Sequence, residues 1–229
     1  MEPARRSFAP PPPGAARRRP HLELPRVIPM TNPGPVYCGA VRRYLDPDCG
    51  GIAAKVLPGQ FYVTGTEAVV TVLGSCVAAC IRDRETGIGG MNHFMLPVRP
   101  GPHDDYAGAA ARYGNHAMEL LINEILRLGG RRANLEAKVF GGARVLTIPS
   151  EVGARNSAFV RAYLALEGVP LVADDLGGDH PRKVIFFPAQ GRVRVRKLRR
   201  GGEGDVIARE RHYVRELASR PIGGEIEFF

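Results

Sequence analysis

The sequence predicts a single α/β domain, a mixed β-sheet layered with helices. Residues 77–82 alternate with a period of two, which favours a strand. Residues 109–128 instead repeat apolar side chains at helical spacing, which favours an amphipathic helix. The chain has 229 residues, of which 44% are hydrophobic, and this is enough for one domain with a substantial core.

Composition divides the chain into four parts. Residues 1–35 hold ten of the twenty prolines together with clusters of arginine, so they are predicted to form a disordered tail. Residues 36–59 are predicted as a transitional segment and residues 60–200 as the main domain. Residues 201–229 begin with several glycines and are predicted as a peripheral extension.

The main domain is predicted to begin with a buried strand and a hairpin. Residues 68–73 are apolar except for Thr71, which is typical of a buried strand. The strand at 77–82 is followed by the polar residues 83–86, which predict a four-residue loop. The apolar stretch 88–96 then predicts the returning strand of the hairpin.

The simplest register of this hairpin brings a cysteine and a histidine together. The four-residue loop places Arg82 opposite Gly87, and the same count places Cys76 directly opposite His93. Directly opposed residues share a face, with Cβ atoms about 4.5–5.5 Å apart. A base at that distance activates a cysteine, because the thiolate is its nucleophilic form. Residues 89–90 are two glycines, a candidate bulge at which the register would slip by one residue.

Gly74 and Ser75 directly precede the cysteine. A glycine allows a sharp turn and lets a substrate approach the backbone closely. We therefore expect the backbone amides around Ser75 and Cys76 to face a developing oxyanion.

The rest of the main domain alternates between strands and helices. The helix at 109–128 ends at two glycines. Asn156 suits the N-cap of a second helix. The remaining predicted elements are a strand at 135–140, a helix at 157–167, strands at 169–173, 184–187 and 192–196, and a short helix at 207–217.

The charge and hydropathy of the chain exclude two classes of partner. The formal net charge is +9, but residues 1–43 alone contribute +6 from eight arginines and two glutamates. The main domain therefore needs no basic face, and nucleic-acid binding is not predicted. No apolar run approaches the roughly 18–20 residues of a membrane helix, and no secretory signal is present. We therefore expect no membrane insertion and a cytoplasmic location.

The four cysteines do not form a metal or disulfide framework. Their spacing lacks the paired short gaps of zinc sites, so no metal is predicted. Cys76 and Cys80, if they share a strand, lie roughly 13 Å apart. That separation excludes a disulfide between them, and Cys80 is predicted to be a core residue.

Five sequence blocks in order carry a resemblance to a known family. They resemble the CheD family of bacterial chemoreceptor glutamine deamidases over about residues 60–198. The blocks are Thr71 with Gly74-Ser75-Cys76; Met91-Asn92-His93-Phe94-Met95-Leu96-Pro97; Lys138-Val139-Phe140-Gly141-Gly142-Ala143; residues 148–156; and Glu167-Gly168-Val169-Pro170 leading to residues 173–178.

The resemblance implies a specific site and substrate. It implies a triad in which Cys76 is the nucleophile, His93 the general base and Thr71 the residue that orients the histidine. It also implies a layered sandwich with the catalytic hairpin at one edge, no cofactor, and methyl-accepting chemotaxis receptors as substrates. A CheC-type phosphatase is an implied partner, and Arg155 or Asn156 is an implied site candidate.

Two alternatives stay open at this stage. The protein could be a non-catalytic adaptor that binds receptors, or a different cysteine hydrolase such as a protease or transglutaminase. Ammonia release from a receptor peptide separates these hypotheses, because an adaptor releases none and a protease cuts the backbone instead.

Overall fold

The computed structural model describes residues 41–97, 106–145, 151–198 and 204–219. All of them belong to one compact unit, Gly34–Phe229. The predicted tail at 1–35 and the first part of the transitional segment lie outside the described residues.

The described residues form ten strands, three α-helices and a short 3-10 helix. In chain order they are β1 (Arg42–Asp46), β2 (Gly51–Lys55), β3 (Phe61–Thr64), β4 (Ala68–Leu73), β5 (Val77–Asp83), β6 (Gly89–Asn92), α1 (Tyr106–Arg127), η1 (Arg132–Asn134), β7 (Leu135–Gly141), α2 (Val152–Leu166), β8 (Leu171–Leu176), β9 (Arg182–Phe187), β10 (Arg192–Lys197) and α3 (Gly204–Ser219). None of these helices is long and apolar enough to cross a membrane.

The strands form two five-stranded sheets that both mix parallel and antiparallel pairs. The first sheet has the order β1-β2-β4-β9-β10 and the second has the order β3-β6-β5-β7-β8. The pairs β2–β4 and β7–β8 are parallel and the others are antiparallel. The predicted mixed α/β class is confirmed, although the strands divide between two sheets rather than one.

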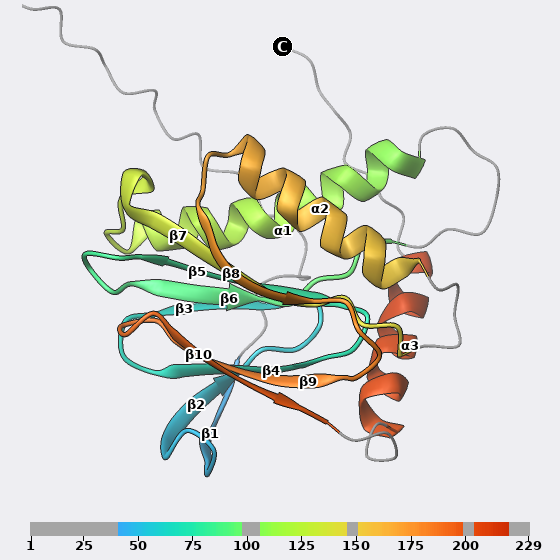
Figure 1. Ribbon diagram of the computed structural model, residues 1–229, viewed down its shortest axis with the longest axis horizontal. Helices are drawn as coiled ribbons and strands as arrows, with labels where there is room; N and C mark the ends of the chain where they lie inside the picture. Colours follow the sequence, from blue (N-terminus) through green and yellow to red (C-terminus); the bar gives the residue numbers. More distant parts are fainter. Residues whose placement is uncertain (1–40, 98–105, 146–150, 199–203, 220–229) are drawn as a thin grey trace, which may run out of the picture. The chain divides into compact units, whose positions relative to one another are not determined.

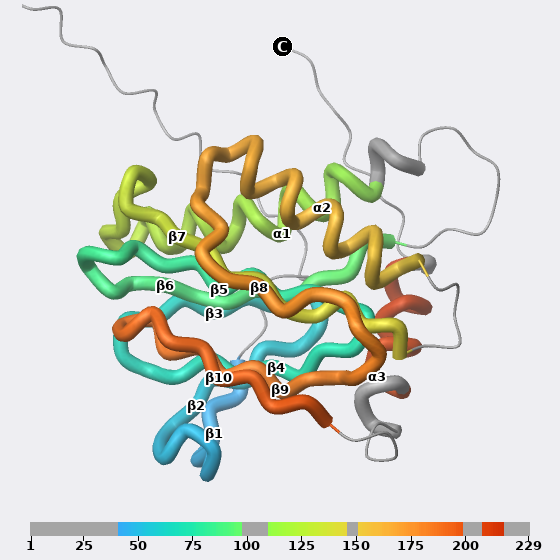
Figure 2. The backbone as a smooth tube through the Cα atoms, viewed as in Figure 1, coloured from blue at the N-terminus to red at the C-terminus, as the bar shows by residue number. Residues whose placement is uncertain are grey.

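Two apolar cores hold three layers together. Helices α1 and α2 cover one face of the second sheet, and the first sheet lies against its other face (Figures 1 and 2). Because strand side chains alternate between faces, β5 contributes to both cores. Val77, Ala79 and Ile81 face the helices, whereas Ala78 and Cys80 face the first sheet.

Most predicted elements occur within a few residues of their expected positions. Strand β4 has the predicted bounds, and Cys80 is a buried core residue with a free thiol. Helix α2, however, begins at Val152, so Asn156 lies inside it and the N-cap prediction is wrong. The amide of Asn156 is instead bound to the backbone of two other segments.

The predicted hairpin is present, but its register differs by two residues. Strand β5 continues to Asp83, whose N–H donates to the carbonyl of Ile88, so the four-residue loop is 84–87. Arg82 therefore pairs with Gly89 rather than with Gly87. The shift is even, so Cys76 and His93 keep a common face but become diagonal neighbours, which are still within reach of long side chains.

The position of the hairpin in the sheet also differs from the expectation. We expected it at one edge, but β6 and β5 lie between β3 and β7 in the second sheet. Asn92, which ends β6, is structural, because its amide accepts a hydrogen bond from the N–H of Ala79 and donates one to the carbonyl of Ala117.

Candidate active site

The three residues predicted as a triad come from both sheets and meet in the core between them. Thr71 lies on β4 of the first sheet, Cys76 directly precedes β5, and His93 directly follows β6 of the second sheet. All three side chains are buried. The stacking of the two sheets, and not the hairpin alone, therefore assembles the group.

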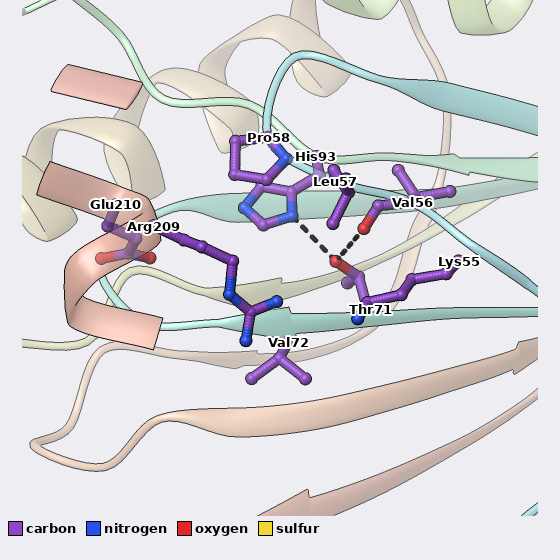
Figure 3. Close-up of a pocket in the computed structure, with 9 residues that line it drawn as sticks. All are labelled: Lys55, Val56, Leu57, Pro58, Thr71, Val72, His93, Arg209 and Glu210. Carbon is purple, nitrogen blue, oxygen red and sulfur yellow. Dashed lines mark hydrogen bonds between the residues drawn. The ribbon is translucent and has the colours of Figure 1, made fainter. Parts of the chain in front are cut away.

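The hydroxyl of Thr71 determines which nitrogen of His93 carries the proton. It donates to the carbonyl of Val56 at 2.7 Å and lies 2.8 Å from Nδ1 of His93. Figure 3 marks both contacts with dashed lines. The one proton of the hydroxyl is used toward the carbonyl, so the hydroxyl oxygen accepts from Nδ1–H. The lone pair of the ring is then on Nε2, the nitrogen needed by a general base.

The ring of His93 lies close to the thiol of Cys76. The donor atoms of Cys76, His93 and Glu210 are within 4.8 Å of one another, and Nε2 has no hydrogen-bond partner among the described residues. Burial, and to a lesser degree the charge of Arg209, lowers the pKa of His93 to about 3. Burial and then the Glu210 carboxylate raise the pKa of the Cys76 thiol well above its ordinary value. In this arrangement both groups are therefore neutral.

Residues 74–76 form an amide cradle, in which three consecutive backbone N–H groups converge on one anion. The N–H groups of Gly74, Ser75 and Cys76 donate to the carboxylate of Glu210 at 2.8, 3.0 and 3.2 Å. The hydroxyl of Ser75 donates to it as well, at 2.8 Å. Successive N–H groups in such a concave turn are a common anion-binding device. The amides of Ser75 and Cys76, which we expected to face a developing oxyanion, here bind a carboxylate of the chain itself.

The carbonyls of the amide cradle are held on its other side. Those of Gly74 and Cys76 accept hydrogen bonds from the N–H groups of Ala143 and Gly142, at 2.8 and 2.7 Å. The middle carbonyl, that of Ser75, accepts from the side-chain amide of Asn156 at 2.9 Å. Because every carbonyl is engaged elsewhere, the three N–H groups are left free to point at the anion. Asn156 is therefore a positioning residue for the cradle.

The carboxylate in the amide cradle belongs to a residue that sequence reasoning missed. We predicted residues 201–229 as a peripheral extension, yet α3 brings Glu210 to within hydrogen-bond distance of the cradle from 134–136 positions away. The available signal was spacing: Glu210, Tyr213 and Leu217 follow the i, i+3, i+7 pattern of one helix face. All three are buried.

The same atoms also match a metal-ligand set. A thiol, an imidazole and a carboxylate are the donors that zinc prefers. Here, however, both oxygens of Glu210 already accept hydrogen bonds from the amide cradle. Backbone N–H groups thus account for the position of the carboxylate, and an anion site describes this geometry better than a metal centre.

Comparisons with known proteins identify the family. A family model described as CheD chemotactic sensory transduction matches residues 95–197. A protein of Halorhodospira halophila named "Probable chemoreceptor glutamine deamidase CheD" is 53% identical over 196 residues, covering 83% of this chain and 91% of its own length. The chain belongs to the CheD family. Proteins with the same name from Janthinobacterium sp. and Herminiimonas arsenicoxydans are 52% and 51% identical over 193 residues, each covering 83% of this chain and 95% of their own length.

Membership of the CheD family confirms the resemblance found in the sequence. The family model begins its match at residue 95. Its match therefore does not include Thr71, Cys76 or His93, so the roles of these residues depend on the geometry of the site.

Proposed function

We propose that this protein hydrolyses the side-chain amide of glutamine in chemotaxis receptors, which yields glutamate and ammonia. The names of its CheD relatives support the reaction and the substrate. The observation that carries the proposal is the contact of Thr71 with Nδ1 of His93, because it leaves the lone pair on Nε2 of a histidine whose ring lies close to the buried thiol of Cys76.

The first half of the proposed reaction forms a thioester. Nε2 of His93 accepts the proton of the Cys76 thiol, and the thiolate attacks the carboxamide carbon. The carbonyl oxygen becomes an oxyanion, which takes hydrogen bonds from the N–H groups of the amide cradle. The imidazolium then returns its proton to the departing nitrogen, and ammonia leaves.

The second half releases the product. His93, again neutral, accepts a proton from a water molecule that attacks the thioester carbon. The amide cradle stabilises the second oxyanion as it did the first. Collapse of this intermediate breaks the carbon–sulfur bond, restores the thiol and leaves a glutamate side chain on the receptor. No cofactor takes part in this scheme.

The family resemblance supports two finer proposals. The first is a cytoplasmic location, which cell fractionation tests. The second is a CheC-type phosphatase as a partner, which co-purification of the two full-length proteins tests.

The proposal is tested with receptor fragments and two protein variants. Wild-type protein is expected to release ammonia and to add about 1 Da at each converted glutamine. Cys76→Ala should abolish both signals and keep the fold. Thr71→Val should slow the reaction about 100-fold, because His93 loses its orientation, whereas Thr71→Ser should restore most of the rate.

Three outcomes would contradict the proposal. Binding of the receptor without ammonia release would indicate a non-catalytic adaptor. Cleavage of the receptor backbone would indicate a protease. Undiminished ammonia release by the Cys76→Ala variant would exclude this cysteine as the nucleophile.

A further inference from the structure

Helix α3 presents one buried face and one exposed face. Glu210, Tyr213 and Leu217 are buried, while Arg211 and His212 are exposed. Tyr213 and Leu217 join the apolar core between the sheets, and the hydroxyl of Tyr213 contacts that of Tyr113 on α1. The buried face is therefore apolar at two positions and carries a carboxylate at the third.

A buried carboxylate is unusual on a helix face whose only role is to pack against the core. Burying a carboxylate costs free energy unless hydrogen bonds replace its water shell. Glu210 is 1% exposed, and the replacement comes from the amide cradle and the hydroxyl of Ser75. The donors that hold Glu210 are thus the ones that the proposed reaction uses for its oxyanion.

Glu210 also has the chemical form of the proposed product. Deamidation converts a glutamine into a glutamate, whose carboxylate carbon has just left the sulfur of Cys76. Glu210 is a glutamate whose oxygen lies within 4.8 Å of both the Cys76 sulfur and the His93 ring nitrogen. Figure 3 shows Glu210 and Arg209 on α3 at the pocket that His93 and Thr71 line.

We propose that α3 is an internal product analogue: it seats Glu210 in the amide cradle where the product glutamate binds, and it must leave before a receptor glutamine can enter. This inference rests on the proposed function and adds to it a closed state of the enzyme. Cys76 is 0% exposed beneath α3, so neither a substrate nor a small reagent reaches its sulfur while the helix is seated.

The electrostatics of the closed state agree with an inactive site. The pKa of the Cys76 thiol is raised by burial and by Glu210, and that of His93 is lowered by burial and by Arg209. Both charged residues belong to α3. Departure of the helix removes the two charges together and admits water, which favours the thiolate and the imidazolium.

The first test measures access to the thiol and does not depend on the proposed reaction. Full-length protein is treated with iodoacetamide, and the alkylation of Cys76 is followed by peptide mass spectrometry. Glu210→Ala and Tyr213→Ala are each expected to raise its rate at least about tenfold, because each removes a contact that seats the helix. His212→Ala, a change on the exposed face of the same helix, should leave the rate unchanged. Equal rates in all four proteins would overturn the closed state.

The second test asks whether residue 210 occupies the position of the reacting side chain. In Glu210→Gln the product analogue becomes a substrate analogue. The purified variant is expected to gain about 1 Da at residue 210, because Cys76 converts the glutamine back to glutamate. The gain should be absent in a Cys76→Ala, Glu210→Gln double variant. Two results would overturn the assignment of residue 210 to the position of the reacting side chain. One is a glutamine that persists at residue 210 in a single variant that still deamidates receptors. The other is the same gain in mass in the double variant, which lacks Cys76.

The two tests separate this inference from the proposed function. If the protein deamidates receptors but alkylation shows no closed state, only the role of α3 fails. If receptors are not deamidated and residue 210 is not converted, the proposed function fails, and the alkylation rates still report whether α3 covers the thiol.

Discussion

Two buried carboxylates lie at opposite ends of β5, and each accepts three backbone N–H groups. Asp83, the last residue of the strand, accepts from Glu85, Thr86 and Arg131 at 2.7, 3.0 and 2.7 Å. Glu210 accepts from the amide cradle just before the strand begins. The number of backbone donors is the same, but Asp83 is part of the strand that it supports, whereas Glu210 arrives on another element.

This difference in origin determines what each carboxylate contributes. Two donors of Asp83 lie within three residues of it, so these bonds form whenever the hairpin turn forms. Those of Glu210 form only when α3 docks. Cys76 is itself part of the amide cradle that binds Glu210, whereas the backbone donors to Asp83 belong to Glu85, Thr86 and Arg131. We conclude that Asp83 stabilises the fold and that Glu210 controls access to the thiol.

The largest expected effect is on stability at the Asp83 end. Asp83→Ala leaves buried N–H groups without an acceptor and is expected to lower the free energy of unfolding by about 3 kcal/mol. Glu210→Ala should lower it by less than about 1 kcal/mol, because the freed N–H groups become hydrated when α3 leaves. Urea denaturation measures both, with Glu85→Ala on the exposed turn as control. A larger loss of unfolding free energy in Glu210→Ala than in Asp83→Ala would contradict this assignment of roles to the two carboxylates.

Acid should weaken the contribution of Asp83. Burial alone would raise the pKa of Asp83, but hydrogen bonds from backbone N–H groups outweigh it and lower this pKa below its ordinary value. A carboxyl with a lower pKa in the folded state stabilises the protein above its unfolded pKa of about 3.9 and loses that contribution as pH falls through the folded pKa. Wild type should therefore lose more stability than Asp83→Ala on acidification, which urea midpoints at pH 7 and at acidic pH measure.

A smaller effect is expected on the titration of the thiol at the Glu210 end. The Glu210 carboxylate raises the pKa of Cys76 in addition to burial, so removing this anion lowers that pKa. The pH profile of Cys76 alkylation should shift to lower pH in Glu210→Met, which keeps roughly the size of the side chain and cannot be deamidated. Asp83→Asn at the far end of the strand should leave the profile in place. Coincident profiles for wild type and Glu210→Met would show that the carboxylate does not act on the thiol.

The smallest expected effects come from alanine substitutions of one glycine near each carboxylate. A Cβ at Gly74 would lie 2.6 Å from Cγ2 of Val145 and 2.8 Å from the Glu210 carboxylate. Gly74→Ala should therefore displace Glu210 and modestly speed Cys76 alkylation. Gly87, in the hairpin loop, has a φ of 74°, so Gly87→Ala should cost about 1 kcal/mol of stability. The Cys76 alkylation rate of Gly87→Ala is expected to match that of wild type. An unchanged rate in Gly74→Ala, or a faster rate in Gly87→Ala, would show that the two glycines do not differ in their effect on the thiol.

Local pattern was sufficient to predict the elements that surround the site. The alternation at 77–82 and the apolar run at 68–73 correspond to β5 and β4. The hairpin register was missed because Asp83 extends the strand and binds the turn with its own side chain, a contact that periodicity does not report. Helix α2 was started too late because its first residues are small and polar and resemble a loop.

The sequence by itself determined the α/β class, the family resemblance, and the candidate residues Thr71, Cys76 and His93, because these depend on residue types at short spacing. Only the tertiary structure decided which nitrogen of His93 is free and what occupies the amide cradle. Those two features join β4 to β6 and α3 to the start of β5. Contacts across such separations depend on how sheets and helices stack, and no local pattern in the chain encodes them.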